Sequence, residues 1–115
     1  MMTMNISEYI DSLPFDSDLK KRIAMTYSCK DCEKRNKVDG AGKIFKENNY
    51  HFQLMHNGIK VIKDGYHGKG MTEIIRLLEG HHEPQEEKAF FEILKYIQPN
   101  SVMVELGSHW SYYSL

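Results

Sequence analysis

The stretch that decides the fold lies at residues 102–115 and reads Val102-Met103-Val104-Glu105-Leu106-Gly107-Ser108-His109-Trp110-Ser111-Tyr112-Tyr113-Ser114-Leu115. Its first three residues predict a strand that is apolar on both faces, as in the centre of a parallel sheet. A glycine turn and the start of a helix are expected to follow. In α/β proteins this unit holds a nucleotide-like ligand, because the glycine allows close backbone approach and the helix start offers free N–H groups.

The wider pattern of this stretch is more specific than a strand and a turn. It resembles the first S-adenosylmethionine-binding motif of class I methyltransferases, which reads acid-x-Gly-x-x-x-Gly, and in particular the FkbM-type branch. Glu105 matches the acid, Gly107 matches the first glycine, and residues 112–115 match a Tyr-Tyr-Thr/Ser-Leu tail. The preceding segment, residues 82–87, looks like the entry to the same domain.

The resemblance implies a set of cofactor contacts at the methionine end of S-adenosylmethionine. The implied residues are Glu105, Gly107, Ser108, His109 and Ser111. Two of these positions depart from the family pattern, since Ser111 replaces the second glycine and His109 is larger than usual. The resemblance further implies O-methyl transfer to a small molecule or a glycan. No residue qualifies as the substrate-side base, so the catalytic residues stay unknown.

The expected fold class is α/β, or α+β for the 115 residues as they stand. N-terminal helices and a β-hairpin would precede the first βα unit of a truncated Rossmann-like domain. We expect three parts, which are a helical segment with a linker (residues 1–42), a hairpin with a short helix (43–80) and the start of the methyltransferase domain (81–115). A lone parallel strand leaves its backbone groups unpaired. The chain is therefore expected to be an N-terminal fragment, inactive alone, or to self-associate through an exposed strand.

The composition and the N-terminal sequence limit the classes of binding partner and the cellular location that we expect. The chain has 41% hydrophobic and 27% charged residues, as is ordinary for a globular protein, and its formal net charge is −1. This balance predicts no nucleic-acid or membrane partner. No apolar run approaches the ~20 residues that span a bilayer. The N-terminus lacks a signal-peptide pattern, so the expected location is the cytoplasm.

Local signals predict four helices before residue 100. Asn5 and Glu8 form a capping-box pattern, Pro14 ends that first helix, and a second helix begins near Ser17. The stretch from Cys29 to Asn49 is expected to be a solvated helix end or linker. The apolar stripe of the third helix is Met71, Ile74, Ile75 and Leu78, with Gly80 ending it in a left-handed conformation. The fourth helix starts at Pro84 and is expected to bury Phe90, Ile93, Leu94 and Ile97.

Residues 50–63 predict a β-hairpin around Asn57-Gly58, a dipeptide typical of two-residue turns. A two-residue turn would place Leu54 opposite Val61 and Phe52 opposite Lys63. Ile59 and Val61 would then share one buried face with Leu54 and Phe52.

Three groups of residues carry weaker functional alternatives. Cys29-x2-Cys32 with His51 and His56 resembles the ligand order of a zinc finger, but the gap exceeds ~12–15 residues, so a reduced pair without metal is expected. His81 and His82 beside Glu83 are interpreted as a polar loop rather than a metal or base cluster. Tyr112 and Tyr113 are interpreted as core residues rather than as an adenine-stacking pair. A non-catalytic interaction module derived from a methyltransferase is the alternative function.

Overall fold

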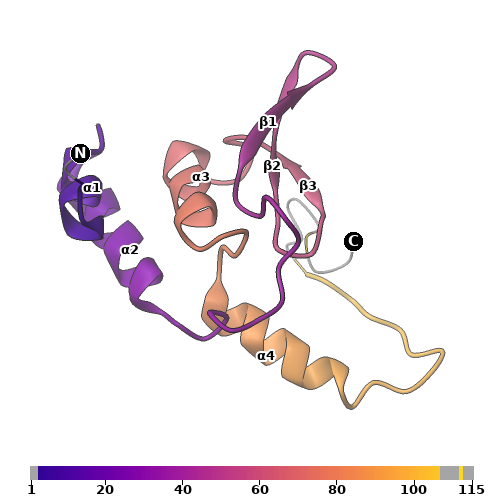
Figure 1. The fold of residues 1–115 in the computed structure, drawn as a ribbon. Coiled ribbons are helices and arrows are strands. Elements are labelled where there is room, and N and C mark those ends of the chain that lie inside the picture. Colours follow the sequence, from indigo (N-terminus) through magenta and orange to yellow (C-terminus); the bar gives the residue numbers. More distant parts are fainter. Residues whose placement is uncertain (1–2, 107–111, 113–115) are drawn as a thin grey trace.

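The computed structural model describes residues 3–106 and Tyr112. Within them the chain is a mixed α+β structure of four helices and one antiparallel sheet with strand order β1-β2-β3 (Figure 1). In chain order the elements are α1 (Ile6–Ser12), α2 (Ser17–Ser28), β1 (Ile44–Glu47), β2 (Tyr50–Leu54), β3 (Lys60–Ile62), α3 (Gly68–Leu77) and α4 (Pro84–Leu94). In Figure 1, α3 lies between the N-terminal helices and the sheet.

The N-terminal helices begin where the sequence predicts. The N–H of Glu8 donates to Asn5 Oδ1 at 2.8 Å, and the N–H of Asn5 donates to Glu8 Oε2 at 3.1 Å, which completes the capping box. The side chain of Asp16 caps α2 by accepting the N–H of Leu19 at 2.8 Å. Caps of this kind contribute about 1 kcal/mol each because they satisfy donors that the helix leaves free.

A first core joins these helices to α3. Its buried members are Ile10, Leu13, Ile23 and Ile74. A Cβ at Gly70 would lie 2.7 Å from Leu19 Cδ1, so glycine permits the close approach of α2 and α3. These contacts connect two of the expected parts of the chain, and the boundaries at residues 42 and 80 stay predictions.

The segment before residue 50 supplies a strand that the sequence analysis missed. Residues 44–47 were expected in a polar linker, but they pair with β2 as β1. Asn48 and Asn49 make the two-residue turn with φ values of 50° and 70°. Phe45 stacks on Phe52 across the pair at 5.9 Å between ring centroids. Two successive asparagines, which tolerate positive φ, were the available signal for this turn.

The β2–β3 hairpin exists, but the predicted register is wrong by one residue. Gln53, not Leu54, lies opposite Val61, and Phe52 lies opposite Ile62. The loop has three residues, because the N–H of Met55 donates to Ile59 O at 2.8 Å and the N–H of Gly58 donates to Met55 O at 3.0 Å. Gly58, at φ 91°, takes the left-handed position of such a loop.

The register decides which side chains are buried, because a slip of one residue exchanges the two faces of a strand. Gln53 and Val61 are buried, whereas Leu54 and Phe52 are only half-buried. The Gln53 amide donates to the backbone oxygens of Gly42 and Thr72 at 3.0 and 2.9 Å. A polar residue therefore occupies the face that connects the sheet to α3.

Gly80 has positive φ, 96°, as predicted, but α3 ends at Leu77 and the left-handed residue that follows its C-cap is Glu79, with φ 53°. The carbonyl oxygen of Gly80 accepts the N–H of His56 at 3.1 Å, and a Cβ at Gly80 would lie 2.8 Å from His56 Cα. The glycine thus brings the hairpin loop against the turn that precedes α4. This contact positions His56 beside His81 and His82.

The start of α4 at Pro84 is confirmed, but its predicted buried face is wrong. Ile93, Leu94 and Ile97 are 60%, 43% and 47% exposed, and Phe90 is half-buried. Only the first turns of the helix are covered, at Pro84 and Glu87, and the rest runs away from the sheet in Figure 1. Helical spacing identifies residues that share a face, and burial requires a second element that the described residues do not supply.

The strand predicted at residues 102–104 is also wrong for the structure described. Residues 101–105 have no regular secondary structure, and Val102 and Val104 are 88% and 76% exposed. A strand forms only when a neighbour pairs with its backbone, and no described strand reaches this segment. None of the described helices is both long enough and apolar enough to cross a membrane.

Candidate functional site

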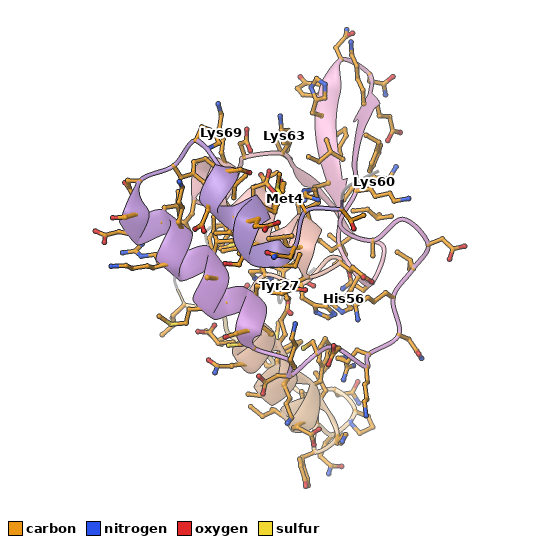
Figure 2. The ribbon with its side chains drawn as sticks, turned by 60° about the vertical axis from the view of Figure 1, so that its left-hand side comes forward. Met4, Tyr27, His56, Lys60, Lys63 and Lys69 are labelled. Atoms are coloured by element: carbon orange, nitrogen blue, oxygen red, sulfur yellow. The ribbon has the colours of Figure 1, made fainter. Side chains whose placement is uncertain are left out.

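A buried group of titratable side chains lies where the hairpin loop meets the start of α4. We name it the histidine–glutamate cluster, and its members are His56, His81, His82, Glu87 and Tyr112. Each is at most 6% exposed, and Glu87 is fully buried. Groups of this polarity are rarely buried unless they bind one another or a ligand. His56 lies at the end of the sheet that faces α4 in Figure 2.

Glu87 is the centre of the cluster because its carboxylate contacts two imidazoles. Glu87 Oε2 lies 2.7 Å from His81 Nδ1, and Glu87 Oε1 lies 2.7 Å from His82 Nδ1. His82 Nε2 also lies 3.3 Å from Glu83 Oε2. An ionised carboxylate can only accept hydrogen bonds, so the Nδ1 atoms of both histidines carry hydrogen.

Glu87 and His82 form a buried ion pair. Burial alone would raise the pKa of Glu87, but hydrogen bonds from His81 and His82 and their charge lower it to about 2. Burial alone would lower the pKa of His82, but Glu83 and Glu87 together raise it to about 9. At neutral pH, Glu87 is therefore an anion and His82 is a cation.

His56 has the opposite electrostatic environment from His82. Its ring stacks on His81 with 4.1 Å between centroids, and burial followed by repulsion from His81 lowers its pKa to about 4. Burial and the charge of Glu87 raise the pKa of Tyr112. Tyr112 therefore keeps its proton, and we assign its hydroxyl as the donor to His56 Nδ1 at 3.2 Å.

Cys32 extends the cluster toward a pocket of about 120 Å³. The thiol is buried and donates to Pro84 O at 3.3 Å, and burial followed by the charge of Glu87 raises its pKa. The lining of the pocket includes Tyr27, Cys29, Cys32, Glu33, His81 and Pro84. Tyr27 lies near the C-terminal end of α2 in Figure 2.

The cluster brings potential metal ligands together in one place. One donor atom each from Cys32, His81 and Glu87 lies within 4.8 Å of the other two. The Nε2 atom of His81 is buried and has no hydrogen-bond partner among the described residues. With Nδ1 carrying its hydrogen toward Glu87, Nε2 carries the lone pair and can bind a cation.

The expected cofactor residues contribute little to this site. Glu105 is half-buried, and Gly107, Ser108, His109 and Ser111 lie outside the described residues. Tyr113 also lies outside them. Tyr112 is buried, in agreement with its interpretation as a core residue.

Sequence reasoning missed the partners that make the cluster. His81 and His82 were interpreted as a polar loop, but they are 1% and 2% exposed. The available signal was the pair of histidines before a proline-started helix, with Glu87 on its first turns. Cys29 and Cys32 are free thiols, and the ring beside Cys32 is His81 rather than His51.

Comparison of the chain with protein-family models, with curated proteins and with solved structures found no match.

Proposed function

We propose that this chain is the N-terminal part of an S-adenosylmethionine-dependent methyltransferase of the FkbM type. The observation that carries the proposal is the motif from Glu105 through Gly107 to the Tyr-Tyr-Ser-Leu tail. Glu105, Gly107 and the backbone of residues 108–111 would hold the methionine end of the cofactor. The acceptor would be a hydroxyl of a small molecule or a glycan, in the cytoplasm.

The tail and the entry segment of the resemblance pack against each other through Tyr112. The ring of Tyr112 meets His82 edge-on at 4.6 Å between centroids, and its hydroxyl contacts His56. Residues 82–87 and the tail that includes Tyr112 are two of the stretches that carry the resemblance, beside Glu105 and Gly107. Their contact supports the proposal because it brings both stretches into one folded unit.

The exposed apolar face of α4 also supports the proposal. Ile93, Leu94 and Ile97 follow the helical period, yet the described residues leave them exposed. In a Rossmann-like domain, the helix before the first strand packs on a parallel sheet. We propose that residues 102–104 join such a sheet when neighbouring strands are present.

Cofactor binding tests this function more directly than turnover, because the resemblance covers only the first motif. Calorimetry would measure S-adenosylmethionine binding to the wild-type chain, to the protein continued along its natural reading frame, and to Glu105→Gln and Glu92→Gln variants. We expect saturable binding. The affinity for S-adenosylmethionine should fall about tenfold in Glu105→Gln and stay unchanged in the exposed control Glu92→Gln. Absence of binding in both lengths of wild-type protein overturns the proposal.

The second candidate function is a non-catalytic interaction module. It is favoured by one observation, the exposure of Val102, Val104 and Leu106 at 88%, 76% and 90%. Contiguous exposed apolar surface is typical of contact sites between proteins. Such a module would self-associate through this segment and would not bind the cofactor.

A further inference from the structure

Cys32, His81 and Glu87 come together from distant parts of the chain, and the first two also line the pocket. Cys32 follows the end of α2, His81 precedes α4, and Glu87 lies on α4. Donor atoms of the three lie within 4.8 Å of one another, and all three residues are at least nine-tenths buried. A fully buried carboxylate is rare unless it is paired, and Glu87 is paired here with His81 and His82.

His81 has the arrangement of a metal-binding histidine. Its Nδ1 hydrogen is held by Glu87 at 2.7 Å, which fixes the tautomer and the ring orientation. The opposite nitrogen, Nε2, is buried and has no hydrogen-bond partner in the described part of the chain. Metal-bound histidines characteristically donate the second ring N–H to a carboxylate, which also increases the basicity of the ligating nitrogen.

A second thiol, that of Cys29, lines the same pocket. Cys29 and Cys32 both line it together with His81, and its volume of about 120 Å³ accommodates an ion with a water molecule. The Cys29 thiol has only a long contact, 3.5 Å to Met25 O. Cys29 is not one of the three converging residues, so its thiol must turn from Met25 O toward Cys32 and His81 to share a ligand with them.

We propose that Cys29 Sγ, Cys32 Sγ and His81 Nε2 bind a divalent cation of the zinc class. Two thiolates and an imidazole select Zn²⁺ over Mg²⁺ or Ca²⁺, which prefer oxygen ligands. The cation displaces one proton from each thiol, so binding releases two protons. Water from the pocket occupies the fourth position, and Glu87 orients His81 without binding the metal. The site connects the end of α2 to the start of α4.

The binding experiment uses the reduced, chelator-treated 115-residue chain. Zn²⁺ would be titrated against a chromophoric chelator, and Co²⁺ absorption would report thiolate coordination. One equivalent is expected to bind. The affinity for Zn²⁺ should fall in each of the variants Cys29→Ser, Cys32→Ser and His81→Gln. The fall should exceed the about 10–100-fold that is typical when a residue that only orients a ligand is replaced. His51→Gln, an exposed histidine on β2, is the matched control and should bind like wild type.

Thiol alkylation tests the site in the wild-type chain, where no variant can misfold. Zn²⁺ should slow alkylation of both cysteines by at least about tenfold, and Mg²⁺ should have no effect. Release of two protons per Zn²⁺ in weak buffer is expected as well. The proposal is overturned if Zn²⁺ leaves either thiol unprotected, if His81→Gln binds with unchanged affinity, or if His51→Gln loses binding.

Discussion

At the scale of single residues, the structure depends on Glu87. This carboxylate is fully buried, shares a hydrogen bond with the buried His81 and forms an ion pair with the buried His82. Its helix would form with many other residues at that position, since Pro84 and the first-turn acids already start it. The role of Glu87 is therefore to neutralise His82 and to orient His81.

Removing this carboxylate should destabilise the fold strongly. Glu87→Ala leaves the buried His82 cation with only Glu83, which is partly exposed, and the expected loss in unfolding free energy is about 3 kcal/mol. Urea denaturation at pH 7 measures it. Glu92→Ala, on the exposed part of the same helix, should behave like wild type. Equal stabilities of the two variants would contradict the role assigned to Glu87.

Histidine protonation should give a maximum of stability near pH 6.5 in the metal-free chain. The pKa of His82 is raised to about 9, so its contribution is complete below about 6.5 and is lost as the pH rises toward 9. The pKa of His56 is lowered to about 4, so the folded state resists its protonation and loses stability as the pH falls from about 6.5 toward 4. Glu87, with a pKa of about 2, adds a loss between about 4.5 and 2.

Urea denaturation across pH 4–9 in the presence of a chelator measures this profile. On each side of the maximum, the acid limb below pH 6.5 and the alkaline limb above it, the unfolding free energy should change by an amount on the order of 1–3 kcal/mol. His56→Gln should flatten the acid limb above pH 4.5 and leave the alkaline limb in place. A profile that rises steadily from pH 6.5 to 9 would contradict the assignment of His82 as a cation.

At the scale of elements, the connection between the hairpin and α4 depends on one glycine. Gly80 adopts φ 96° and contacts His56 through its own carbonyl oxygen. The hairpin register matters in the same way, because Gln53 instead of Leu54 faces the turn of Gly42 and the backbone of Thr72. Both features were decided by contacts outside their own elements.

Gly80→Ala should lower the free energy of unfolding considerably more than Gly68→Ala. Both glycines have positive φ, at 96° and 73°, so both substitutions carry similar backbone strain. Only at Gly80 would the new Cβ overlap the backbone of His56, whereas nothing lies within 4 Å at Gly68. The expected losses are about 3 and about 1 kcal/mol in thermal or urea unfolding. Similar losses at both positions would show that the hairpin loop can move away without cost.

At the scale of the whole molecule, apolar surface gathers at one end of the chain. The last turns of α4 and residues 102–106 carry it, and Figure 1 shows this segment running out from the body and returning toward the sheet. Exposed contiguous apolar surface favours association in water. Under the proposed function, the same surface would pack on further strands.

The 115-residue chain should therefore self-associate. Light scattering after size exclusion is expected to give a mass above that of the monomer, and Val102→Lys with Val104→Lys should restore the monomer. Met25→Lys with Ile62→Lys, at apolar positions that are 68% and 51% exposed elsewhere, is the matched control and should leave association unchanged. A monomer at every concentration would contradict the prediction.

The sequence by itself determined the features that depend on neighbours within a few residues. The Asn5–Glu8 capping box, the helix start at Pro84 and the left-handed Gly80 follow from backbone geometry and short-range hydrogen bonds, and all three are confirmed. Only the tertiary structure decided the hairpin register, the exposure of α4 and the burial of the histidine–glutamate cluster. Tyr112 contacts His56, which is 56 residues away in the sequence, and Cys32 contacts Pro84, which is 52 residues away. No local sequence pattern encodes such contacts. The predicted strand at 102–104 failed for the same reason, because strand formation requires a partner whose position the local sequence does not specify.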